Sequence, residues 1–74
     1  MNVGIIGSGG REHALCISLK KSKKVKNIYC FPGNAGTSFI AENIEVDLTN
    51  FKELKKLIYK LDIGIVIVGP EKPL

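Results

Sequence analysis

The sequence is poor in the residues that build disulfide frameworks, metal sites and membrane spans. Its 74 residues include no tryptophan, one histidine and two cysteines that do not form a C-x-x-C pair. A disulfide framework and a structural zinc site are therefore not expected. No apolar run approaches the roughly 18 residues of a membrane span, and the N-terminus lacks the charged and then apolar pattern of a signal peptide. These absences favour a protein of the cytoplasm.

The composition that is present is typical of a folded globular protein. Hydrophobic residues make up 45% of the chain and charged residues 24%, and isoleucine and valine together supply 15 residues. So much apolar side-chain surface excludes intrinsic disorder. A chain of this length, however, buries only about 60% of the surface that its unfolded form exposes. We therefore expect a folded chain with a marginal core.

The positive charge is concentrated in one stretch. The net charge is +4, and five of the eleven basic residues lie close together: Lys20, Lys21, Lys23, Lys24 and Lys26. No aromatic residue is interleaved there for base stacking, which disfavours a nucleic-acid site. Cations at the end of a helix are stabilised by the helix dipole by a few tenths of a kcal/mol. We interpret the stretch as a solvated helix end.

Strand and helix patterns alternate along the chain. Short apolar runs bounded by glycine or proline predict strands, and apolar residues three or four apart predict helices. Cys16 in the first helix and Cys30 in the second strand are expected to pack in the core. The expected elements are a strand over 2–6, a glycine turn over 7–10, a helix over 11–21, a strand over 27–31, a helical turn near 37–41, a strand over 44–46, a helix over 51–61 and a strand over 63–68.

The last helix and strand have the clearest patterns. Apolar residues spaced by 3, 3, 1 and 3 positions form one continuous helical face: Phe51, Leu54, Leu57, Ile58 and Leu61. Asn50, followed three positions later by Glu53, fits a capping box. The run over 63–68 is almost wholly β-branched, which is typical of a parallel strand covered on both faces.

The alternation of strands and helices predicts an α/β fold. Its sheet should be parallel with right-handed crossovers, like the mononucleotide-binding half of a Rossmann-like doubly wound fold, with strand order 3-2-1-4. Ligands of such sheets bind beyond the carboxyl ends of the strands, where the strand order reverses. Here the first and fourth strands meet at that point, followed by the turns over 7–10 and 69–71. We therefore expect the site at these turns.

The glycine turn suits a phosphate group. The backbone N–H groups of such a turn close on an anion, and the helix behind it contributes about half a positive charge. The dinucleotide fingerprint G-x-G-x-x-G would need a glycine at the position of Glu12, and the acidic residue expected after the second strand is missing. A monophosphate or an anionic sugar phosphate is favoured. The alternative is that the glycines serve turn geometry alone, with Glu12 merely favourable at a helix start.

Other polar residues stand beside these turns, each with two interpretations. Arg11 opposes the helix dipole, so either a nearby anion or simple exposure accounts for it. Asn34 and Thr37 serve either a ligand or ordinary turn chemistry. Glu71 either receives an amine or ribose hydroxyls or is a solvated loop residue. His13, the single histidine, is interpreted as a packed or capping residue, and no hydrolytic triad is supported.

Three sequence blocks, in this order and spacing, resemble the N-terminus of the phosphoribosylamine–glycine ligase family, also called glycinamide ribonucleotide synthetases. The blocks are GSGGREHAL at 7–15, PGNAGT at 32–37 and VGPEKPL at 68–74, and DLTNF at 47–51 is similar to a further family stretch. The resemblance covers essentially the whole chain. It departs from the family pattern at Lys72, where a small residue is usual.

The resemblance implies an ATP-grasp ligase of de novo purine biosynthesis. Such an enzyme uses ATP with Mg²⁺ or Mn²⁺ to convert glycine to a glycyl phosphate. The amine of 5-phosphoribosylamine then attacks it, giving glycinamide ribonucleotide, ADP and phosphate. Residues 1–74 correspond to a truncated N-terminal, pre-ATP-grasp domain that holds the phosphoribosyl substrate on an incomplete sheet. The ATP-grasp domains that bind nucleotide and metal are then the missing partners of this chain, which alone is expected to be inactive.

The resemblance also implies roles for individual residues. Gly9 and Gly10 would cradle the 5′-phosphate. The side chains of Asn34, Thr37 and Glu71 would face the ribose or the amine. No catalytic residue and no metal ligand is expected within the chain, and the expected partners are small-molecule substrates rather than nucleic acid or a membrane. The alternative function is a non-catalytic module that binds a sugar phosphate or a mononucleotide. The expected substrate-binding residues are Gly9, Gly10, Arg11, Asn34, Thr37 and Glu71.

Overall fold

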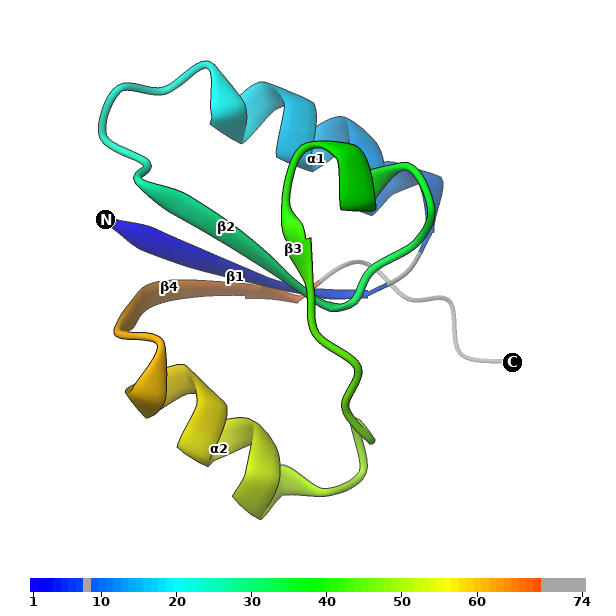
Figure 1. Ribbon diagram of the computed structural model, residues 1–74, viewed down its shortest axis with the longest axis vertical. Helices are drawn as coiled ribbons and strands as arrows, with labels where there is room; N and C mark the ends of the chain where they lie inside the picture. The colour runs from blue at the N-terminus through cyan, green and yellow to red at the C-terminus, as the bar shows by residue number, and fades with distance from the viewer. Residues whose placement is uncertain (8, 69–74) are drawn as a thin grey trace.

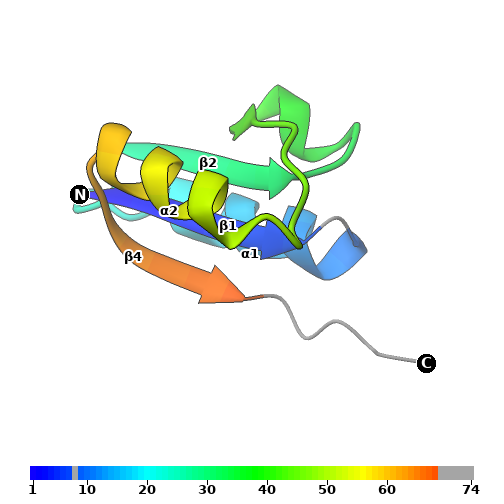
Figure 2. The same ribbon diagram turned by 90° about the horizontal axis from the view of Figure 1, so that it is seen from below.

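The computed structural model describes residues 1–7 and 9–68. A four-stranded parallel sheet carries one helix on each face (Figures 1 and 2). Its strand order, β3-β2-β1-β4, confirms the predicted fold class and topology. The elements in chain order are β1 (Asn2–Gly7), α1 (Gly10–Lys20), β2 (Asn27–Pro32), the 3₁₀ turn η1 (Thr37–Phe39), β3 (Glu42–Asn43), α2 (Phe51–Lys60) and β4 (Ile63–Val68).

The core lies between α1 and the two central strands, β1 and β2. Alternate side chains of each strand point to this face, as the period of a strand requires. On the opposite face, glycine at position 4 makes room for two larger side chains, because a Cβ there would lie 3.2 Å from Phe31 and 3.3 Å from Ile63. The buried residues of the core cluster are Val3, Ile5, Cys16, Ile28 and Cys30.

Two cysteines join α1 to the sheet at the centre of this core. The Sγ atoms of Cys16 and Cys30 lie 3.3 Å apart, and both thiols are free and fully buried. Their burial confirms the prediction that both cysteines pack in the core. Loss of hydration on burial, followed by the hydrogen bond to Cys30, raises the pKa of Cys16 from 9.0 to about 12.

The prediction for the third strand is wrong by two residues. It was expected over 44–46, whereas the paired residues are those of β3. The backbone N–H of Ile44 still donates to the carbonyl of Cys30, at 2.7 Å. Alternate residues of a parallel strand turn their backbone groups to the same neighbour. After the carbonyl of Cys30, the next hydrogen bond from β2 to β3 would need the N–H of residue 32, which is Pro32. Proline has no N–H to donate, and the pairing ends there.

The predicted helix after position 50 is confirmed, with one exception on its apolar face. The side chain of Asn50 accepts a hydrogen bond from the backbone N–H of Glu53 at 3.2 Å, as a helix cap does. Leu54 is buried, and the next three apolar residues of the face are half-buried. The side chain of Phe51 is 76% exposed. Side chains tilt toward the start of their helix, so this first residue extends past the helix end.

The expectation that the fourth strand is covered on both faces is also wrong. β4 stands at the end of the strand order, with β1 as its sole neighbour in the sheet of described residues. Exposed fractions reach 45% for Ile65, 38% for Val66 and 66% for Val68. α1 contacts β1 and β2, and α2 contacts β4, so neither helix covers this strand completely. The β-branched run forms an exposed apolar edge.

The surface beyond α1 agrees with the interpretation of the basic stretch. Lys20 lies in the last turn of α1, and all five lysines between positions 20 and 26 are exposed. Their charges are therefore hydrated, as at a solvated helix end. Within residues 1–7 and 9–68, no helix has the length and apolar character needed to cross a membrane.

The 74-residue chain, produced by itself, is expected to self-associate through β4. An unprotected edge of apolar β-branched residues pairs with other chains, and a lysine on the edge opposes this. Val66→Lys should weaken self-association by about tenfold. Sedimentation across a concentration series measures it, with Ile17→Lys on the exposed surface of α1 as the matched control. A wild-type chain that stays monomeric at high concentration would contradict this expectation.

The thiol of Cys16 is expected to resist alkylation in the folded protein. A pKa raised from 9.0 to about 12 lowers the reactive thiolate fraction at neutral pH by about a thousandfold. Iodoacetamide at pH 7.5 should therefore modify Cys16 only as fast as the fold opens. Mass spectrometry of native and denatured samples checks this. Native labelling as fast as that of the denatured chain would show that the thiol is not held in this core.

Candidate functional site

The glycine turn and the loop after β2 lie together at the carboxyl ends of the strands (Figure 2). The backbone N–H of Gly33 donates to the carbonyl of Gly7 at 3.0 Å. The side-chain amide of Asn34 donates to the carbonyl of Gly9 at 2.9 Å. These two hydrogen bonds join the loop to the glycine turn. The structure thus brings together two of the three motifs that the sequence singled out.

The glycines of the turn differ in what the fold requires of them. Gly7 has φ +149°, and a Cβ there would lie 2.7 Å from Cδ of Glu12, so the fold requires glycine. Gly9 has an ordinary extended backbone with φ −90°. At Gly10, a Cβ would meet no described atom within 4 Å. Packing therefore explains the first glycine and leaves open space beside the last one.

At the N-terminus of α1, two backbone donors have no partner among the described residues. Gly9 is the cap residue and has no side chain to accept from them. Its own N–H donates to Oε1 of Glu12 at 2.5 Å, and the N–H of Glu12 donates to the carbonyl of Gly9 at 3.2 Å. The backbone N–H groups of Gly10 and Arg11 donate to no residue among those described. Both residues are exposed, and N–H groups in the first turn of a helix are the ones that bind anions at helix N-termini.

Glu12 is a buried acidic residue. Only 4% of its surface is exposed, and its carboxylate lies against Gly7 and Gly9. The hydrogen bond from Gly9 and the positive end of the helix dipole both favour a carboxylate there. The sequence interpretation treated this residue as favourable without function and missed its contact with the turn. A glutamate three positions after a helix cap was the available signal.

The loop after β2 is held by a compact hydrogen-bond network. The Thr37 side chain is fully buried. Its hydroxyl accepts from the backbone N–H of Asn34 at 2.8 Å and donates to Oδ1 of Asn43 at 2.7 Å. Oδ1 of Asn34 in turn accepts from the N–H of Thr37 at 2.9 Å. The network fixes Asn34 with its amide aimed at the glycine turn.

Asn43 completes this network, and no sequence pattern had indicated it. Its side-chain amide donates to the carbonyl of Asn34 at 2.8 Å. Gly33 has φ +79°, and a Cβ there would overlap Oδ1 of Asn43, so only glycine fits. On the other side of the loop, the His13 ring packs against Gly36, where a Cβ would lie 3.0 Å from its Nδ1. This contact agrees with the interpretation of His13 as a packed residue.

The predicted site residues therefore fall into three groups. Gly9, Gly10 and Arg11 form the exposed start of α1, and Asn34 is bonded to it. Thr37 lies beneath the loop rather than at the surface. The sixth residue of the predicted set, at position 71, lies outside the described residues, as does the turn over 69–71.

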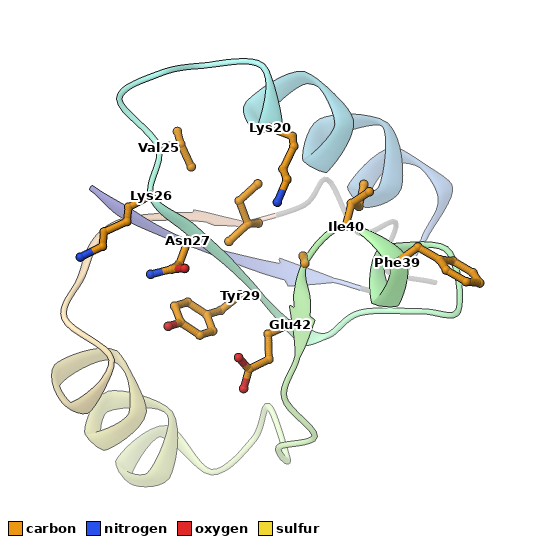
Figure 3. Close-up of a pocket in the computed structure, with 10 residues that line it drawn as sticks. Lys20, Val25, Lys26, Asn27, Tyr29, Phe39, Ile40 and Glu42 are labelled. Atoms are coloured by element: carbon orange, nitrogen blue, oxygen red, sulfur yellow. The ribbon is translucent and has the colours of Figure 1, made fainter.

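A groove formed by described residues lies away from this site. It has a volume of about 510 Å³ and is formed by the end of α1, the outer edge of β2 and the segment from η1 to β3 (Figure 3). None of the five predicted site residues within the described part of the chain lines it. Over the described part of the chain, no group of three or more His, Cys, Asp or Glu side chains is placed to hold a metal ion. The residues that line the groove are Lys20, Val25, Lys26, Asn27, Ile28, Tyr29, Phe39, Ile40, Ala41 and Glu42.

Comparison with known proteins gives one consistent family. The chain is 47% identical over 73 residues to a phosphoribosylamine–glycine ligase of Rhodopirellula baltica, covering 99% of the chain and 17% of that protein. It is 45% identical over 74 residues to the enzymes of the same name from Caldanaerobacter subterraneus and Mycobacterium bovis, covering 100% of the chain and 18% of each. The chain thus spans less than a fifth of the length of these curated relatives. The family described as "Phosphoribosylglycinamide synthetase, N domain" matches residues 1–74, and the chain belongs to this family.

Proposed function

We propose that residues 1–74 form the part of a phosphoribosylamine–glycine ligase that holds 5-phosphoribosylamine. The observation that carries this proposal is the uncapped start of α1, where the N–H groups of Gly10 and Arg11 have no partner among the described residues. A Cβ at Gly10 would meet no described atom within 4 Å. Relatives at 45–47% identity bear the name of this ligase. A phosphate of the substrate fits both the charge and the room at this helix end.

The proposed contacts follow from the placement of the loops. The two open N–H groups bind the 5′-phosphate, and the exposed Arg11 side chain adds a positive charge beside it. Asn34 reaches the same turn from β2 and lines the ribose side of the site. Glu71, which follows β4 in the sequence, remains assigned to the ribose or the amine by the resemblance alone.

The remaining domains of the longer protein supply the rest of the reaction. The family resemblance assigns ATP and Mg²⁺ or Mn²⁺ to those domains. ATP, when bound there, activates the carboxylate of glycine for acyl transfer. The residues of this chain hold the ribosylamine by its phosphate and keep its amine oriented for attack. The products are glycinamide ribonucleotide, ADP and phosphate.

Thr37 acts in this proposal by positioning Asn34, not by touching the substrate. Its hydroxyl is fully buried and is engaged with Asn34 and Asn43. This differs from the role that the resemblance implied, in which Thr37 faces the ribose or the amine. A rigid loop reduces the conformational freedom that substrate binding must remove.

The activity itself is tested with the full-length protein. Purified protein should form glycinamide ribonucleotide only when glycine, ATP, a divalent cation and 5-phosphoribosylamine are all present. Release of ADP and product formation are followed together. Binding of ribose 5-phosphate without any ligation would instead favour the non-catalytic sugar-phosphate module.

Gly10→Val is expected to separate substrate binding from folding. The new side chain enters space that no described atom occupies, so the melting temperature should stay within a few degrees. It also covers the open N–H groups, and the KM for 5-phosphoribosylamine should rise by about tenfold or more, with the KM for ATP unchanged. Ser18→Val, on the exposed side of the same helix, is the matched control. Equal changes in both KM values would contradict the assignment.

Thr37→Val is expected to loosen the loop. It preserves shape but leaves the Asn34 N–H and Oδ1 of Asn43 without their buried partner, at a cost of about 1–3 kcal/mol in the free energy of unfolding. Thr37→Ser retains the hydroxyl and should recover most of this loss. Chemical denaturation of the full-length protein measures the difference. A valine variant as stable as wild type would show that the Thr37 hydroxyl does not stabilise the loop.

A further inference from the structure

The buried carboxylate of Glu12 makes a hydrogen bond within the proposed phosphate site that contacts to a phosphate do not explain. It takes the Gly9 N–H, which would otherwise be one more donor at the start of α1. A carboxylate of the protein that accepts such an N–H competes with a bound anion for the same donor. The exposed part of the turn keeps two unpartnered N–H groups, those of Gly10 and Arg11, among the described residues.

We propose that Glu12 is a positioning residue that determines which donors the phosphate meets. Its carboxylate fixes the Gly9 N–H in the turn and directs the 5′-phosphate to the N–H groups of Gly10 and Arg11. This role rests on the proposed function, because it concerns the same phosphate site. It adds a residue that touches no substrate yet shapes the site from behind.

Packing holds the carboxylate in this place. Glu12 is 4% exposed, and Cα of Gly7 lies so close that a Cβ there would be 2.8 Å from Cγ of Glu12. The carboxylate is therefore packed directly against the glycine turn. Asn34 binds the Gly9 carbonyl at 2.9 Å, so both polar backbone groups of Gly9 are engaged. Gly9 is therefore held in place by hydrogen bonds, and the N–H groups proposed to bind the phosphate are those of Gly10 and Arg11.

The same geometry selects the class of phosphate ligand. A dinucleotide turn places glycine at this helix position, which lets the helix approach the strand and the pyrophosphate approach the backbone. Here a carboxylate fills that place, removes one donor and sets a negative charge behind the turn. A single phosphate meets two donors and the exposed Arg11, whereas a pyrophosphate would extend its second charge toward Glu12. We therefore expect a site for a sugar monophosphate.

Three substitutions in the full-length protein test this role. Glu12→Gln keeps an oxygen that can accept from Gly9, and should leave the dissociation constant of ribose 5-phosphate within about twofold. Glu12→Ala removes the acceptor, and Glu12→Asp keeps the charge but is one methylene shorter. Both should raise that dissociation constant and the KM for 5-phosphoribosylamine by about tenfold, with kcat and the KM for ATP unchanged.

Glu53→Ala is the matched control, because Glu53 occupies the same position after the cap of α2. It should lower the melting temperature as loss of a helix contact does, and leave both constants for the sugar phosphate unchanged. Binding of inorganic pyrophosphate, measured by calorimetry, should strengthen in Glu12→Ala relative to ribose 5-phosphate. If Glu12→Ala does not fold, Glu12→Asp and Glu12→Gln carry the comparison.

The outcomes separate this role from the proposed function. Wild-type protein that binds no ribose 5-phosphate refutes the phosphate site and the role of Glu12 with it. Wild-type binding with unchanged constants in Glu12→Ala and Glu12→Asp refutes the role of Glu12 alone. Equal increases in the KM values for ATP and the sugar phosphate would show a structural effect on the whole protein, and would also overturn it.

Discussion

The parallel pairing of β1 with β2 is the constraint on which the site depends. The two strands are in register from their first residues to Gly7 and Pro32, where both end. Parallel strands that end together release their following loops at one edge of the sheet. The hydrogen bond from Gly33 to Gly7 continues the pairing one step beyond the strands. Two motifs separated by about 25 positions in the sequence thereby become one surface.

The sequence predicted the parts of the structure that repeat a local pattern. Both helices and the cap at Asn50 follow from periodicity and from residues within one turn of each other. The strand order follows from the alternation of strands and helices, which favours one arrangement of a parallel sheet. The position of β3 could not be read in this way, because it is decided by a missing N–H on another strand, at Pro32. The exposure of Val68 likewise depends on which elements surround β4, and composition does not contain that information.

The candidate site shows the same division between local pattern and tertiary contact. The glycine turn and Asn34 were found because such residues mark turns and helix starts. The sequence could not distinguish a glycine that the fold requires, such as Gly7, from one that it does not, such as Gly10. Nor could it distinguish a hydroxyl that faces a ligand from one that is buried beneath a loop, as at Thr37. Both distinctions depend on neighbours that lie far away along the chain.

The site and the exposed apolar edge occupy different parts of the sheet. The described site residues follow β1 and β2, whose side chains form the buried core with α1. The exposed side chains of Ile65 and Val68 lie on β4, which pairs with the opposite side of β1. The loops are fixed by their own hydrogen bonds, through Thr37 and Glu12. The geometry at the start of α1 is therefore set by β1, β2 and α1 together with the loop network of η1 and β3, on the side of β1 away from β4.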